Sequence, residues 1–216
     1  MRIGANTIII LVILVLFSLF IAFYDKISIL FLSITKKSRI KKKLKKIAKN
    51  SDYLLLNNLV LYINDYNYIE IEHLLIANKY IYVLTSKSYY GDINGIASDN
   101  VWRLYKGSRL SHISNPLPNN LKRLRTVAHL TNLDEKNFIS LVIINKPSFT
   151  NDIRSSRDNE FVVRENDLTT FIKEQESKKT VNEFTIAFQE KIANVINNYS
   201  EDCKMKLKRA QLNNIN

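Results

Sequence analysis

The chain is poor in the residues that build several common kinds of functional site. Its 216 residues include one cysteine, three histidines, four glycines and three prolines. A single cysteine excludes a disulfide framework and a cysteine-based structural zinc site, and three histidines argue against a histidine-built metal centre. Neither GxGxxG nor GxxxxGK[ST] occurs, so the common glycine-rich phosphate loops are absent. The length fits one domain with attached segments.

Positive charge is concentrated in one short segment. The net charge is +12, with 32 Lys+Arg against 20 Asp+Glu. Nine basic residues and no acidic residue lie between positions 36 and 49: Lys36, Lys37, Arg39, Lys41, Lys42, Lys43, Lys45, Lys46 and Lys49. Without these nine and Arg2, a net charge of about +2 remains for the rest of the chain. A basic surface over the whole folded part is therefore not expected, although a local basic groove stays open.

The N-terminal segment predicts a transmembrane anchor. The 22 residues from Ile3 to Tyr24 carry no charge, and a helix of that length reaches about 33 Å, enough to cross a hydrocarbon layer of about 30 Å. A cleaved signal peptide is the alternative, but its apolar region is shorter and ends in small residues. Here the bulky Phe20, Ile21 and Phe23 occupy the exit, which favours an uncleaved anchor.

The flanking charges predict the orientation of the anchor. Nine cations follow the span and only Arg2 precedes it, so the positive-inside rule places the later residues in the cytoplasm and the N-terminus outside. A short apolar stretch from Ile27 to Ile34 is too short to cross a bilayer and fits an interfacial position. The basic residues could attract anionic lipid headgroups. The alternative is that they only fix the topology and stay solvated.

The remaining sequence predicts an α/β layered domain. Residues 68–75 and 80–85 are rich in β-branched and aromatic residues and form a predicted hairpin around the turn 77–79. Residues 138–145 are a continuous apolar strand of the kind that is buried on both faces. Residues 53–63 are predicted as a helix end or loop that runs into a strand, and further strands are predicted near 93, 101–102 and 161–163. Helices are predicted over 119–130, 167–174 and 180–198, the last opened by a capping box at Thr180–Glu183.

At this point the chain resembles a known family. The segments IEIEHLLI (69–76) and YIYVLTSK (80–87), followed by Gly91, Trp102 and Asn115-Pro116-Leu117, resemble the NERD (nuclease-related) domain family. Members of that family follow a pattern of I-D-H, a strand ending in E-x-K, a glycine turn, a tryptophan and N-P-L. The resemblance implies a restriction-endonuclease-like PD-(D/E)xK core and metal-dependent phosphodiester hydrolysis as the ancestral chemistry.

The resemblance, which covers about residues 50–175, implies site residues. Glu72 takes the first carboxylate position, where the family usually has Asp, and Lys87 matches the family lysine. Two carboxylates would hold Mg²⁺ or Mn²⁺, and the lysine would orient the attacking water. The second carboxylate should stand two residues before Lys87, where this chain has Thr85. A hydroxyl replaces a formal negative charge poorly, although Glu70 could partly compensate as a second metal ligand.

Two further departures point to the same conclusion. Residues 119–133 contain no acid that could replace the missing carboxylate, and they offer Asn119 and Asn120 where family helices often place Gln. The upstream helix, which often supplies a Glu, is rich in lysine here. We therefore expect impaired catalysis and no bound cofactor, with Mg²⁺ or Mn²⁺ required if hydrolysis survives.

Each candidate residue also has a structural interpretation. Glu70 and Glu72 alternate along a strand and could be its solvated side. Lys87 could be a surface lysine, His73 a packed histidine and Trp102 a core residue, with Asn115-Pro116 setting a turn. The many tyrosines could stack on bases, but packing within the strands explains them better.

Three readings of function follow. The first is a membrane-tethered, catalytically impaired NERD-like domain that acts as a binding or scaffold module. The second is an active metal-dependent nuclease that cuts DNA or RNA with Glu70, Glu72 and Lys87. The third is an interaction protein that binds an unknown protein partner through its C-terminal helices. The predicted organisation is an anchor (1–25), an interfacial basic segment (26–50), a NERD-like domain (51–178) and a C-terminal helical segment (179–216).

Overall fold

The computed structural model describes residues 5–64, 67–89, 91–145, 153, 155, 157–179 and 181–213. The chain forms two compact units, Met1–Arg39 and Ile40–Asn216. Helix α1 (Ala5–Asn50) runs through the boundary between them. The division thus falls after Arg39, whereas the sequence suggested a boundary after residue 50.

The first unit is the N-terminal part of α1. Its side chains are described from Val12 to Ile21 and at Ser38 and Arg39, and these are exposed. The Ser18 hydroxyl donates to the carbonyl oxygen of Val15 at 2.8 Å, inside the helix. Within the part of the chain that the structure describes, no helix combines the length and apolarity of a membrane span. Most of the predicted span from Ile3 to Tyr24 has side chains outside the described set.

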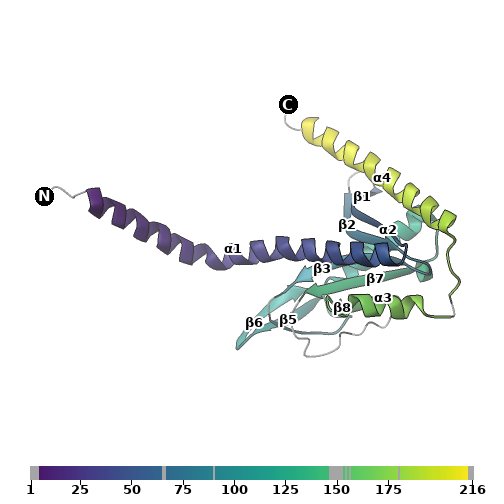
Figure 1. Ribbon diagram of the computed structural model, residues 1–216, viewed down its shortest axis with the longest axis horizontal. Coiled ribbons are helices and arrows are strands. Elements are labelled where there is room, and N and C mark those ends of the chain that lie inside the picture. Colours follow the sequence, from purple (N-terminus) through teal and green to yellow (C-terminus); the bar gives the residue numbers. More distant parts are fainter. Residues whose placement is uncertain are drawn as a thin grey trace. The chain divides into compact units, whose positions relative to one another are not determined.

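The second unit is built on a mixed five-stranded sheet. The strand order is β1-β2-β3-β7-β8, with β1, β2 and β3 antiparallel and β3, β7 and β8 parallel (Figure 1). The bounds are β1 Leu54–Asn64, β2 Asn67–Ile76, β3 Ile81–Ser88, β7 Phe138–Asn145 and β8 Glu160–Arg164. The predicted hairpin is confirmed as β2–β3, closed by a hydrogen bond from the Ala77 N–H to the Tyr80 carbonyl oxygen at 3.0 Å. The expected double-sided burial of β7 is confirmed over residues 138–144.

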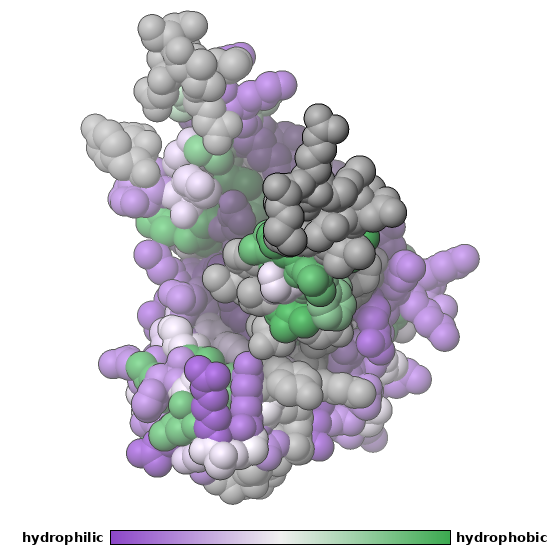
Figure 2. Space-filling model, turned by 90° about the vertical axis from the view of Figure 1, so that its left-hand side faces the viewer, coloured by the Kyte–Doolittle hydropathy of each residue, from purple (hydrophilic) through white to green (hydrophobic). Residues whose placement is uncertain are grey.

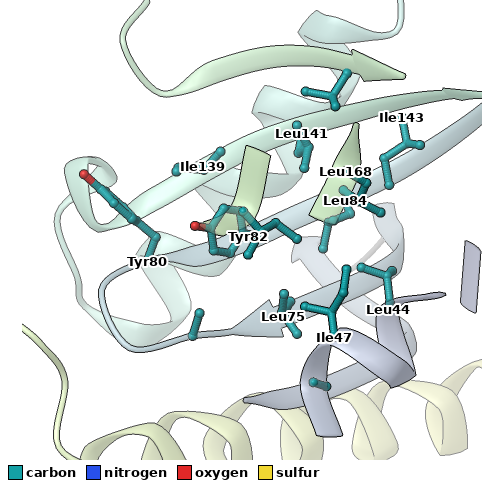
Figure 3. Close-up of a cluster of buried hydrophobic side chains, with 14 of the residues drawn as sticks. Leu44, Ile47, Leu75, Tyr80, Tyr82, Leu84, Ile139, Leu141, Ile143 and Leu168 are labelled. Carbon is teal, nitrogen blue, oxygen red and sulfur yellow. The ribbon is translucent and has the colours of Figure 1, made fainter. Parts of the chain in front are cut away.

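Helices cover both faces of this sheet. The last turns of α1 and helix α3 (Leu168–Glu176) pack on one face, where Leu44, Tyr82, Leu84 and Leu168 meet in one cluster (Figure 3). Helices α2 (Leu117–Thr131) and α4 (Ile186–Asn213) pack on the other face. The result is an α/β sandwich, as the sequence suggested.

The end of α1 belongs to the core of the domain. The structure differs here from the predicted interfacial segment at 26–50. Ile40 and Leu44 are fully buried and Ile47 is nearly so, against the sheet. Their spacing places them on one side of a helix, and that side is taken up by the protein itself. It is therefore not available to a lipid surface.

The C-terminal helix is also part of the core. Instead of starting at the predicted capping box Thr180–Glu183, α4 begins at Ile186, where the Thr185 hydroxyl accepts from the Phe188 N–H at 3.2 Å. Ile196 is fully buried against the sheet, and α4 continues to Asn213. The predicted C-terminal helical segment at 179–216 thus contains α4, whose apolar side completes the second layer of the domain.

A small antiparallel sheet, β4-β5-β6, follows β3 along the chain. Its strands are β4 Asp92–Asn94, β5 Val101–Lys106 and β6 Arg109–Ser114. The predicted strand pair is present as β4–β5, but Ile93 lies opposite Leu104, and Val101 and Trp102 pair with β6 instead. Strand β6 was not predicted because its sequence RLSHIS carries few apolar residues. Gly95 is required here, since a Cβ at this position would lie 2.4 Å from the ring of the fully buried Trp102.

One face of the molecule is mostly hydrophilic where its residues are described. Figure 2 shows purple, hydrophilic side chains over much of the face in view, with green, apolar ones in separate groups. The large apolar side chains of the second unit lie mainly in three buried clusters.

Candidate functional site

Glu72 lies at an irregular point of the sheet. On β1 the neighbouring residue Asn58 adopts a left-handed backbone conformation with φ of 54°. The register pairs Asn57 with His73 and Leu59 with Ile71, so the irregularity falls opposite Glu72. The pairing of β2 with β3 likewise begins only at His73. Glu72 thus lies opposite the left-handed Asn58 and just beyond the paired part of β2 and β3, and its side chain reaches β3.

The Glu72 carboxylate is held by β3. Its Oε2 accepts hydrogen bonds from both the N–H and the hydroxyl of Ser86, each at 2.9 Å. Ser86 is buried and Glu72 is half-buried. The carboxylate thus satisfies a backbone donor where the strand ladder has ended. One of its two oxygens already has a structural role.

Thr85 is fully buried at the predicted position of the second carboxylate. Its hydroxyl oxygen has no hydrogen-bond partner among the described groups. Asn120, on α2, is also fully buried. Its Nδ2 donates to the Val83 carbonyl oxygen and to the Ser140 hydroxyl, both at 2.9 Å, while its Oδ1 has no described partner. Two unpaired neutral oxygens therefore lie in the layer between α2 and strands β3 and β7.

Lys87 and Glu70 complete the predicted set. Lys87 is half-buried two residues after Thr85, so the two side chains share a face of β3. Lys87 has no hydrogen bond or ion pair with another described residue. Glu70 is exposed, and its backbone carbonyl accepts from Arg123 Nε at 2.6 Å. The structure does not show the Glu70 side chain in contact with Glu72.

These residues do not fit a divalent-metal site of the ancestral type. Mg²⁺ is usually held by one or two carboxylates together with water and substrate oxygens. Here the carboxylate of Glu72 is partly used by Ser86, and the buried position beside it carries the neutral Thr85. The described residues contain no group of three or more His, Cys, Asp or Glu that could hold a metal. The arrangement can bind hydrogen-bonding groups, but it offers little negative charge to a cation.

Other residues of the resemblance have structural roles. Trp102 is fully buried and donates from Nε1 to the Ile96 carbonyl oxygen at 3.0 Å. The Asn115 amide donates to the carbonyl oxygens of Ala97 and Asp99, and its Oδ1 accepts from the Leu117 N–H at 2.9 Å. These bonds join the small sheet to the start of α2. The structural interpretation of Trp102 and Asn115 is confirmed.

His73 is a packed residue. It is 6% exposed, and its Nδ1 lies 2.6 Å from Asn57 Oδ1 across the β1–β2 pair. The structural interpretation of this histidine is therefore also confirmed.

The basic residues of α1 divide into two groups. Lys43 Nζ donates to the backbone carbonyls of Glu165 and Asn166, so it fixes the loop before α3. Lys41 is half-buried, and the side chains of Lys36 and Lys37 lie outside the described set. The exposed basic residues are Arg39, Lys42, Lys45, Lys46 and Lys49.

Sequence reasoning missed a half-buried, hydrogen-bonded carboxylate on the other side of the sheet. Glu176 Oε1 accepts from the Tyr82 hydroxyl at 2.7 Å, and Oε2 accepts from the Lys79 N–H at 2.8 Å. Burial raises the pKa of the Glu176 carboxyl, and burial together with the Glu176 charge raises the pKa of the Tyr82 hydroxyl. Nothing at position 176 distinguishes this Glu from an ordinary helix residue in the sequence. It ties α3 to the β2–β3 turn.

Comparison with known proteins identifies one family. The model of the nuclease-related domain (NERD) matches residues 35–145. The match includes the last turns of α1, strands β1 to β7 and α2, and therefore all of Glu70, Glu72, Thr85, Lys87 and Asn120. No curated protein and no solved structure matches the chain.

Proposed function

The chain belongs to the nuclease-related domain family, and from this premise we propose that it is a membrane-tethered NERD domain with impaired metal catalysis that acts by binding. The family supplies a nuclease-related function in the broad sense. The finer proposal, a scaffold without competent hydrolysis, rests on the geometry around Glu72 and Thr85.

One observation carries the proposal. Thr85 is fully buried, with 0% of its surface exposed to solvent. It stands at the position where the resemblance requires a carboxylate. A cation there would meet a neutral hydroxyl in place of a second negative charge. Since hydrolysis by this chemistry depends on a bound metal that activates water and stabilises charge, loss of the charge should disable the reaction.

A cleavage assay on the full chain in mild detergent tests this proposal. Labelled DNA and RNA are incubated with Mg²⁺ or Mn²⁺ and with wild type, Glu72→Ala, Thr85→Asp or Thr85→Glu. We expect no cleavage by the wild type. Cleavage that disappears in Glu72→Ala would contradict the proposal and establish the alternative, an active nuclease using Glu70, Glu72 and Lys87.

The Thr85 variants test whether the residue at position 85 alone accounts for the loss of hydrolysis. Thr85→Asp is the gentler repair because Asp is close to Thr in size, whereas Glu must displace packed neighbours. Activity gained in either variant would show that the scaffold is otherwise intact. Thermal unfolding of each variant is the control, since a buried unpaired carboxylate also destabilises a fold.

The tether is a second part of the proposal. Its support is the uncharged run of 22 residues from Ile3 to Tyr24, followed by nine cations. Within that run, Val12 to Ile21 form helix with exposed side chains, and only Ser18 among them is polar, with its hydroxyl bonded inside the helix. Such a surface suits hydrocarbon better than water. Resistance of the full chain to extraction from membranes by alkaline carbonate is the expected result.

The proposed orientation needs a suitable thiol. Cys203, the single cysteine, is 3% exposed and so cannot report on topology, because it would escape labelling on either side. Met205 is 51% exposed on the same helix. In a Cys203→Ser, Met205→Cys chain, a membrane-impermeant maleimide should label only after the cells are permeabilised. Labelling of intact cells would contradict a cytoplasmic domain.

Anionic headgroups are proposed partners of the exposed basic residues of α1. Each cation near an anionic surface contributes about 1 kcal/mol of attraction. Acetylation of Lys42, Lys45 and Lys49 by a soluble reagent should be slower in nanodiscs containing phosphatidylserine than in neutral ones. Lys136, whose side chain is highly exposed in the short 3-10 helix Glu135–Asn137 before β7, is the internal control. Equal rates in both lipids would favour solvated lysines that only set topology.

A further inference from the structure

We propose that a groove between β1, α2 and α4 binds single-stranded nucleic acid, which would name the ligand class of the binding module proposed above and rests on that proposal. The groove has a volume of about 350 Å³. The side chains that matter to the argument are Tyr62, Lys122, Arg125, His129, Leu130 and Tyr199. They come from three elements that lie close together in Figure 1.

One wall of the groove is cationic. Helix α2 contains no acidic residue, and Lys122, Arg125 and His129 project from its outer side into the groove. Neither the Lys122 ammonium nor the His129 ring has a hydrogen bond or ion pair with another described residue. Arg125 lies 3.2 Å from Glu135 and its side chain remains half exposed. The local charge thus favours an anionic ligand, although the folded part as a whole is nearly neutral.

The other wall is aromatic. Tyr62, on β1, stacks edge-to-face with the exposed Tyr68 at a centroid separation of 6.4 Å. Tyr199 is 37% exposed on α4. Both platforms are firmly held: Ile196 and Ser200 anchor α4 in the interior, and the Ser200 hydroxyl accepts from the Val60 N–H at 2.9 Å. A rigid tyrosine can stack on any base, because every base has an aromatic face.

The combination selects a single strand over a duplex. In a duplex the base faces are covered by their neighbours, so tyrosines beside the groove would meet only the backbone. An unpaired strand can place its phosphates along Lys122 and Arg125 while its bases reach Tyr62 and Tyr199. Sequence-tolerant binding by cations and aromatic platforms is the usual chemistry of single-strand grooves.

The groove is connected to the candidate site through α2. Asn120 and Lys122 are two residues apart on this helix, and the first points into the buried layer above β3 while the second faces the groove. Arg123, between the buried Asn120 and the groove, donates to the Glu70 carbonyl oxygen. The groove and the buried Asn120 therefore lie on the same helix.

The test is fluorescence anisotropy of labelled oligo-dT and oligo-U, with a duplex of equal length, against the full chain in mild detergent. The solution contains EDTA, so binding is measured whether or not any hydrolysis survives. We expect Tyr199→Ala to weaken single-strand binding about tenfold and Tyr199→Phe to retain it, since the phenyl ring still stacks. Lys122→Ala should reduce the slope of log affinity against log salt by about 0.7.

The basic end of α1 requires its own control, because it would attract any polyanion. Lys45→Ala should weaken single-strand and duplex binding together and leave the preference between them unchanged. The inference is overturned if Tyr199→Ala and Lys122→Ala bind like the wild type, if duplex and single strand bind equally, or if no oligonucleotide binds. Cleavage in the separate Mg²⁺ assay would overturn the proposed loss of catalysis and leave this groove standing.

Discussion

Two clusters of polar side chains on strand β3 differ in whether their polar atoms have hydrogen-bond partners. Near its start, Tyr82 donates to Glu176, whose second oxygen accepts from the Lys79 N–H, so both carboxylate oxygens are used. Further along, Thr85 and the neighbouring Asn120 each bury an oxygen without a described partner. Tyr82, Thr85 and Asn120 are fully buried and Glu176 is half-buried, yet only the cluster around Glu176 has a described partner for each of its carboxylate oxygens.

The difference separates buried polar groups that stabilise the fold from buried polar groups that remain from an ancestral functional site. A buried group that serves stability is normally paired, because an unpaired one costs free energy. The Glu176 cluster meets that condition and links α3 to the β2–β3 turn. The Thr85 cluster does not, and it stands where the family resemblance puts a metal-binding carboxylate. We infer that it is the remainder of a site and contributes little to holding the fold.

The largest effect is expected from removing the complete cluster. Glu176→Ala leaves the Tyr82 hydroxyl and the Lys79 N–H without their acceptor, and two lost charge-assisted hydrogen bonds should lower the free energy of unfolding by about 3 kcal/mol. Urea unfolding of the full chain in detergent measures it. Glu174→Ala, an exposed neighbour on α3, is the matched control and should change little. Equal losses in both would remove the distinction between the clusters.

Tyr82→Phe isolates one bond of the complete cluster. The ring stays in the core and only the hydroxyl that donates to Glu176 is lost, so we expect a destabilisation of about 1.5 kcal/mol. Thermal or urea unfolding provides the measurement. A loss near zero would mean that Glu176 does not depend on this donor.

The pH dependence of the free energy of unfolding offers a third comparison. Burial raises the pKa of Glu176 above its ordinary 4.5, so the folded state keeps this proton more readily than the unfolded state. The resulting stabilisation is full below pH 4.5 and is lost as the pH rises through the folded-state pKa. The free energy of unfolding of the wild type should therefore fall, relative to Glu176→Gln, between acid and neutral pH. A difference that does not vary with pH would contradict the shift.

The smallest effect is expected at the incomplete cluster. Thr85→Val keeps the shape of the side chain and removes a hydroxyl that has no described partner, so stability should change by less than about 0.5 kcal/mol or rise slightly. Set beside Tyr82→Phe, this is the sharpest contrast within one strand. A clear destabilisation by Thr85→Val would show that the hydroxyl is paired after all.

Much of the fold could be predicted because local pattern and tertiary structure agree. The apolar run of β7 and the hairpin β2–β3 follow directly from residue type. The end of α1 was assigned to a membrane interface because Ile40, Leu44 and Ile47 alternate with lysines, and helical periodicity does not say which apolar surface will cover a helix. The sheet provides that surface, which only the assembled structure reveals.

The candidate site was predictable only as far as its residues are local to one motif. Glu72, Thr85 and Lys87 were assigned through the family resemblance, whereas the Ser86 bonds to Glu72 and the burial of Asn120 depend on how the strands and α2 pack together. The groove of Tyr62, Lys122 and Tyr199 joins residues far apart in sequence. The one local signal for this groove is that the helix is rich in cations and has no acidic residue. From sequence, that feature was interpreted only as the lack of an acid that could replace the missing metal-binding carboxylate.

Direct measurement of divalent-ion binding tests the central inference most closely. Mn²⁺ is titrated into the full chain and free Mn²⁺ is followed by electron paramagnetic resonance, for wild type, Glu72→Ala and Thr85→Asp. The account predicts that wild type and Glu72→Ala bind Mn²⁺ equally weakly and that Thr85→Asp binds it more tightly. A wild-type site that is lost in Glu72→Ala would show that the metal centre survives, and would contradict the account.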